Sequence, residues 1–176
     1  AALVPIAAIE RGALRIVRGR AVAANLPAHI AQRMASRASS LLSRSGLAAD
    51  IAAERVRAAS PGAGLFLCAE YERTRAGFSA LGAPGKLSET VAEEVVADVV
   101  AFHRSGAAVD SHLADQLIVP AALAAGESRL CAARATGHLA TSAWLVELFG
   151  LARVRVAKSE DGVALVSVLP FGHRVG

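Results

Sequence analysis

The chain has 176 residues, of which 54% are hydrophobic and 19% are charged. This balance excludes an intrinsically disordered chain and suffices for one ordinary domain or two small ones. Nineteen basic residues against fifteen acidic ones give a formal net charge of +4, which permits a polyanionic partner without identifying one.

Cysteine spacing and apolar runs exclude several further classes. Cys68 and Cys131 are far apart and neither belongs to a C-x-x-C pair, so we expect neither a disulfide framework nor a zinc site, and a cytoplasmic location. The longest apolar runs are rich in alanine and interrupted by charges, so we expect no membrane span. Apolar alternation is already present at residue 3 with no basic segment before it, which argues against a signal peptide and suggests a start within a larger architecture.

The first half of the chain has the pattern of strands around one helix. Asn25 and Pro27 are typical of a helix start, and the apolar residues that follow share one face to about residue 44. The turn-prone segment 18–20 is expected to join two short strands, and a Gly/Pro-rich hinge at 82–85 to close the unit. The expected strands lie around Leu14, around Val22, at 49–58 and at 64–71.

Two helices are expected after the hinge. Valines repeat every fourth residue in a segment that Ser88 begins and Gly106 ends, which predicts an amphipathic helix. Asp110 should cap a second helix that runs to Leu123 and is bent or ended near Pro120.

The remaining residues are expected to alternate between strand and helix. A short strand at 128–132 precedes a loop at 134–139, after which Thr141 opens a helix. Asp161-Gly162 is a strong turn signal between the two strands of a terminal hairpin, 152–157 and 163–168. The pattern is α+β, in two units that divide near residue 83.

One face of the second expected helix carries polar side chains. His112, Asp115 and Gln116 are spaced i, i+3 and i+4, and therefore lie on the same side. Such a row could bind a base, a ribose or a metal. A solvated helix face with no ligand explains the same spacing.

His138 lies between an expected strand and an expected helix start. Free helix amides and the helix dipole favour an anionic phosphate at such a position, and a neutral imidazole there could act as nucleophile, base or ligand. A loop histidine bonded to the backbone is the alternative. The other three histidines show no metal-binding spacing and are expected to be structural or exposed: His29, His103 and His173.

An ordered series of segments resembles the RNA 3′-terminal phosphate cyclase family over nearly the whole chain. The most specific segment is S-G-A-A-V-D-S-H-L-A-D-Q-L at 105–117, and T-G-H at 136–138 follows it. Others are A-N-L-P at 24–27, S-P-G-A-G at 60–64 and P-A-A-L-A at 120–124.

The resemblance implies a fold and a division of the chain. It implies an α+β protein in which a small α/β domain at 12–83 is inserted into a larger catalytic domain. Residues 1–11 would be a remnant strand of that domain. Residues 84–176 would be its C-terminal βαβαββ-type repeat unit, which carries the nucleophile loop.

The resemblance also implies an activity and its residues. The family is a ligase of RNA processing that uses ATP to convert RNA 3′-phosphate ends to 2′,3′-cyclic phosphates through an adenylyl-histidine intermediate. His138 would be the nucleophile, and a divalent metal, Mg or Mn, would offset phosphate charge. The residues implied to line the nucleotide pocket are His112, Leu113, Ala114, Asp115 and Gln116.

The family's first half, with its Gly-Gly-Gly-Gln segment, is not in this sequence. We therefore expect either an N-terminal half chain as partner or self-association that hides uncovered apolar faces. The alternatives are a non-catalytic cyclase-like protein that binds RNA or assists ribosome assembly, and an inactive truncated product.

Overall fold

The computed structural model describes residues 3–159 and 161–172. The chain forms two compact units: unit 1 joins Ala1–Arg11 to Ser105–Gly176, and unit 2 is Gly12–Arg104. Within the described ranges no helix is long and apolar enough to span a membrane. The expected division near residue 83 differs from the observed one, because the helix after the hinge packs within unit 2.

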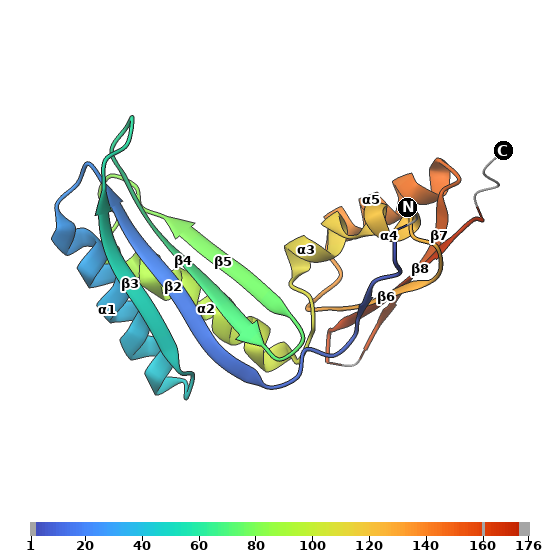
Figure 1. Ribbon diagram of the computed structural model, residues 1–176, viewed down its shortest axis with the longest axis horizontal. Helices are drawn as coiled ribbons and strands as arrows, with labels where there is room; N and C mark the ends of the chain where they lie inside the picture. The colour runs from blue at the N-terminus through green and yellow to red at the C-terminus, as the bar shows by residue number, and fades with distance from the viewer. Residues whose placement is uncertain (1–2, 160, 173–176) are drawn as a thin grey trace. The chain divides into compact units, whose positions relative to one another are not determined.

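Unit 2 is a four-stranded sheet with two helices on one face (Figure 1). Its sheet order is β3-β2-β4-β5; β2 runs parallel to β3 and antiparallel to β4, and β5 is antiparallel to β4. Its elements are β2 (Leu14–Ala24), α1 (Ala28–Arg44), β3 (Ala49–Val56), β4 (Gly62–Tyr71), β5 (Arg75–Leu81) and α2 (Ser88–Ser105).

The core of unit 2 lies between the helices and one side of the sheet. Side chains alternate along β4, so that Leu65 and Leu67 are buried while Phe66 between them is exposed. The Phe102 ring of α2 lies 5.9 Å from the ring of Tyr71 and 5.6 Å from that of Phe78. These contacts hold α2 against the sheet and explain why α2 belongs to this unit.

Two local expectations for unit 2 were wrong. The segment 18–20 forms no turn but lies within one continuous strand, β2, where Arg18 and Arg20 each pair with a carboxylate of β3. Asn25 does not cap α1: it has a positive φ of 52°, and its side chain exchanges two hydrogen bonds with the backbone of Ala58. The strand β5 was not predicted from the sequence pattern.

Unit 1 is a second four-stranded sheet, ordered β1-β6-β8-β7. Only β1 and β6 are parallel; β8 runs antiparallel to both β6 and β7. Its elements are β1 (Ala7–Ala8), α3 (Ser111–Gln116), α4 (Ile118–Ala122), β6 (Ser128–Ala132), α5 (Gly137–Leu148), β7 (Ala152–Lys158) and β8 (Ala164–Pro170). With unit 2 left out, and α3 and α4 counted as one helical segment, the order reads βαβαββ; its first strand is β1, whereas the expectation placed the whole unit within residues 84–176.

The helices of unit 1 cover one face of its sheet (Figure 1). Ile118 of α4 and Leu139 of α5 are buried against Leu130 of β6 and Val166 of β8. The opposite face carries side chains such as Arg129 and remains exposed. The terminal hairpin is confirmed; residue 160 in its turn lies outside the described residues, as does His173.

The helical segment after unit 2 begins and breaks for identifiable reasons. One carboxylate oxygen of Asp110 accepts hydrogen bonds from the N–H groups of His112 and Leu113, at 2.9 and 2.8 Å, so the predicted cap is confirmed. The break falls at Leu117 instead of at Pro120. Proline has no N–H, and its ring clashes with the carbonyl four residues earlier. For Pro120 that carbonyl belongs to Gln116, so the helix is interrupted just after Gln116.

Replacing Leu67 by Ala should lower the free energy of unfolding of unit 2 by about 2–5 kcal/mol, because the side chain is fully buried and its loss leaves a cavity. Leu81→Ala is the matched control, since Leu81 is 75% exposed on the same sheet and should change stability by less than about 0.5 kcal/mol. Urea denaturation followed by circular dichroism measures both. Equal losses for the two variants would contradict the assigned core.

Replacing Asp110 by Ala should cost about 1 kcal/mol, because two N–H groups at the start of α3 lose their acceptor. The amides of His112 and Leu113 should then exchange hydrogen about fivefold faster, which NMR can measure residue by residue. Asp110→Ser, which restores a capping oxygen, should return the exchange rates toward those of the wild type.

Candidate functional site

The helices α3 and α5, which carry the candidate residues of unit 1, begin close together. The N–H groups of Ala108 and Val109 both donate to the carbonyl of Cys131 at 2.9 Å, and the N–H of Ala133 donates to the carbonyl of Val109 at 2.9 Å. This pairing holds the residues before α3 beside the end of β6. Because α5 starts a few residues after β6, the starts of α3 and α5 are kept close together, and the two helices pack against each other.

The five residues of α3 that the resemblance assigned to the nucleotide pocket differ in how exposed their side chains are. Ala114 is fully buried and Leu113 packs against the core of unit 1, so neither leaves its side chain free for a polar ligand. His112 and Gln116 are exposed and Asp115 is partly buried. The polar face predicted from the i, i+3, i+4 spacing therefore exists, and it consists of these three side chains.

His138 lies in the first turn of α5, whereas we expected it in a loop. Helix α5 begins at Gly137, because the hydroxyl of Thr136 accepts a hydrogen bond from the N–H of Leu139 at 3.1 Å and caps the helix. Thr141, the expected start, instead lies within the helix and donates its hydroxyl to the carbonyl of Gly137. The signal for the true start was Thr136, a favoured capping residue that stands directly before Gly137.

The start of α5 presents both an imidazole and unpaired backbone donors. His138 is exposed, and within the described part of the chain the N–H groups of Gly137 and His138 have no hydrogen-bond acceptor. Such amides, together with the helix dipole, attract an anion. An exposed imidazole beside a bound phosphate is placed to act as a nucleophile toward phosphorus.

The other candidates do not join this site. His103 stacks on Tyr71 in unit 2 and hydrogen-bonds its hydroxyl at 3.1 Å, which is a structural role. His29 is exposed at the start of α1. In the part of the chain that the structure describes, no three carboxylate, imidazole or thiol groups gather as a metal would require.

Comparison with protein families identifies the region that contains unit 2. Residues 9–104 match the model of the RNA 3′-terminal phosphate cyclase (RTC) insert domain. The match begins just before β2 and ends where unit 2 ends.

Individual relatives match over a longer stretch. The chain is 54% identical over 159 residues to the RNA 3′-terminal phosphate cyclase of Methylococcus capsulatus, which covers 90% of this chain and 44% of the relative. It is 47% identical to the enzyme of the same name from Trichormus variabilis, over 90% of this chain and 46% of the relative. It is 37% identical to the RNA 3′-terminal phosphate cyclase of Methanopyrus kandleri, over 97% of this chain and 50% of the relative.

These relatives carry the same name, and each is matched over a similar share of its length. The chain spans about half the length of the curated relatives that it matches. The insert-domain match alone covers more than half of the chain. The chain therefore belongs to the RNA 3′-terminal phosphate cyclase family.

Proposed function

We propose that this chain carries the nucleophile half of an ATP-dependent RNA 3′-phosphate cyclase, with His138 as the residue that becomes adenylylated. The observation that carries the proposal is the exposed imidazole in the first turn of α5, beside two N–H groups that have no acceptor in the described structure. Family membership supports the reaction class.

The proposed chemistry follows from an imidazole nucleophile. A ring nitrogen of His138 attacks the α-phosphorus of ATP, pyrophosphate leaves, and an adenylyl-histidine forms. The RNA 3′-phosphate then takes the adenylyl group from His138. The vicinal 2′-hydroxyl attacks the activated phosphate, which closes the 2′,3′-cyclic phosphate and releases AMP.

The side chains of α3 supply contacts to the nucleotide in this proposal. Asp115 can accept a hydrogen bond from a ribose hydroxyl or a base N–H, and Gln116 can both donate and accept. Both belong to α3, which packs against α5, so they lie on the helix that neighbours His138. A divalent metal, Mg or Mn, would offset phosphate charge; we assign it no protein ligands, since the described residues offer no cluster of them.

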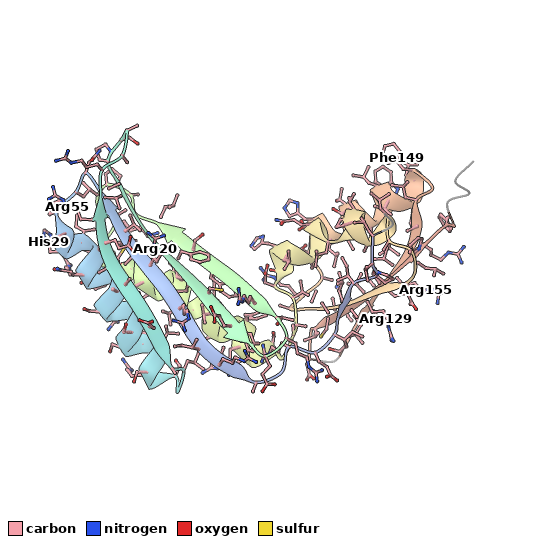
Figure 2. The ribbon with its side chains drawn as sticks, in the orientation of Figure 1. Arg20, His29, Arg55, Arg129, Phe149 and Arg155 are labelled. Atoms are coloured by element: carbon pink, nitrogen blue, oxygen red, sulfur yellow. The ribbon has the colours of Figure 1, made fainter. Side chains whose placement is uncertain are left out.

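We propose that activity requires the part of the relatives' sequence that this chain does not span. Helices α4 and α5 pack on each other and leave a row of large apolar side chains on their outer side: Val119, Leu123, Trp144, Leu148 and Phe149. Phe149 is 73% exposed, at the end of α5 (Figure 2). A monomer rarely leaves so many neighbouring apolar groups in water. We propose that the remaining half of the enzyme, in the same or a second polypeptide of the cytoplasm, covers them.

Incubation with α-labelled ATP and Mg or Mn, followed by acid quench and electrophoresis, tests the nucleophile. We expect label on the chain when the remaining half of the Methylococcus capsulatus relative is added, and none on His138→Asn, because an amide is a far weaker nucleophile than imidazole. His29→Asn is the matched control, since His29 is exposed in unit 2 and should leave labelling unchanged.

Two results would contradict the proposal. Label that persists on His138→Asn would place the adenylyl group elsewhere. Absence of label from the wild type, with the other half present and RNA still bound, would favour the non-catalytic RNA-binding alternative.

A further inference from the structure

The sheet of unit 2 has one face that no helix of that unit covers. We call it the open sheet face and define it by the outward side chains of its three antiparallel strands, which alternate with the buried ones: Arg18, Arg20 and Val22 of β2, Phe66, Cys68 and Glu70 of β4, and Arg75, Gly77, Ser79 and Leu81 of β5. Most of these side chains are small or charged, so this face differs in chemistry from the apolar face under α1 and α2.

Phe66 is the aromatic side chain on this face. It is 47% exposed, whereas Leu65 and Leu67 on either side of it are buried. Its strand neighbours are Arg20 on β2 and Ser79 on β5. A Cβ at Gly77 would lie only 3.2 Å from the edge of the Phe66 ring, so glycine there lets the ring lie close over β5.

Two hollows adjoin Phe66 on the open sheet face. One has a volume of about 740 Å³ and extends from Phe66 past Leu81 to the turn at Ser60. The other is smaller, about 280 Å³, and reaches Asp50 and Cys68. Phe66 and Arg20 line both hollows. The larger hollow lies within the size range of small-molecule sites and can admit a planar group against the ring.

The charge of the chain is concentrated in unit 2. Residues 12–104 carry twelve Lys and Arg against eight Asp and Glu, whereas the rest of the chain carries seven of each. The whole formal excess of +4 therefore belongs to unit 2. This distribution favours an anionic partner for this unit over a neutral one.

Two arginines at the end of β3 have no carboxylate partner among the described residues: Arg55 is in register with buried Ala23 and lies on the helix side of the sheet, whereas Arg57 lies beyond the end of the strand. Arg55 donates its Nε to the carbonyl of Leu26, and Arg57 is exposed; within the described residues neither forms an ion pair. Both line a cavity that shares Val56 with the larger hollow. Figure 2 shows Arg20 on the sheet and Arg55 at its end.

The acidic group nearest to this end of the face is already neutralised. Glu54 accepts hydrogen bonds from Arg20, which lower the pKa of its carboxyl group and keep it ionised within the ion pair. The local balance at this end is therefore set by Arg57, and it is positive.

We propose that the open sheet face of unit 2 binds single-stranded RNA, with a base stacked on Phe66 and a backbone phosphate held by Arg57, beyond the end of β3. The inference rests on the proposed function, because it gives the RNA substrate a second contact, in a unit that carries no part of the proposed nucleophile site. Single strands are favoured over duplexes because only unpaired bases present their faces to a ring. A protein partner is disfavoured because glycine, serine and alanine neighbours offer it little apolar area.

Binding of a fluorescein-labelled oligouridylate of about ten nucleotides, measured by fluorescence anisotropy, tests the stacking contact. Phe66→Ala should weaken binding by about fivefold to a hundredfold, whereas Phe66→Tyr should stay within about twofold of the wild type. Phe171→Ala is the matched control: Phe171 is 42% exposed and belongs to unit 1, so its loss should leave the affinity unchanged.

The phosphate contact is tested by the salt dependence of the same affinity. Arg57→Ser should lower the magnitude of the slope of log K against log[salt] by about 0.7, the value for one phosphate contact with a single strand. Arg44→Ser, which removes an exposed charge from the last turn of α1, should leave the slope unchanged.

A tryptophan reporter tests whether the base lies on the ring itself. Trp144 is the chain's single tryptophan, so the double variant Trp144→Phe, Phe66→Trp carries its only indole on the open sheet face. Saturating oligouridylate should quench its fluorescence, because a stacked base contacts the indole directly.

Three results would overturn the proposal: unaltered affinity of Phe66→Ala, no quenching at saturation, or no RNA binding by the wild type. A change in the sedimentation of Phe66→Ala with unaltered RNA binding would instead make this face a contact between copies of the chain. ATP labelling reports on His138 and needs no RNA. Labelling without quenching therefore removes only this proposal, and quenching without labelling removes only the proposed activity.

Discussion

The candidate site depends on the short backbone pairing between Val109 and the end of β6. The residue after this pairing, Asp110, caps α3, and Thr136, a few residues beyond β6, caps α5. Without the pairing, two helices that are separate in the sequence would have no fixed relation at their starts. With it, a row of polar side chains on one helix and an imidazole on the next belong to adjacent elements, which is the requirement for a nucleotide to contact both.

Both sheets are covered by helices on one face only, and this has different consequences for the two units. In unit 1 the helices bury one side and expose apolar groups such as Leu148 and Phe149 on the other. In unit 2 the helices α1 and α2 are joined by the ion pairs Arg33–Glu89 and Arg37–Glu93. The uncovered surface of that unit is instead the open sheet face, with its aromatic ring and net positive surroundings.

Local chemistry made several features predictable. Asp110 before an apolar run predicts a helix start, and Asp161-Gly162 between alternating segments predicts a hairpin; both are observed. Asn25 misled because asparagine also tolerates a positive φ, and here it bonds to Ala58 instead of capping α1. The turn predicted at 18–20 is absent because Arg18 and Arg20 pair with Asp50 and Glu54 on β3. These partners lie more than thirty residues away, so the local sequence does not reveal them.

The sequence by itself determined the family and the α+β class, and the roles that it suggests for His138, Asp115 and Gln116 stay predictions. Ordered motifs and periodicity carry that information, because they depend on neighbours along the chain. Only the tertiary structure decided that α2 belongs to unit 2, that Ala114 is buried while His112 is exposed, and that His138 lies within a helix turn. These outcomes depend on packing between residues far apart in sequence, such as Phe102 with Tyr71, which no local pattern specifies.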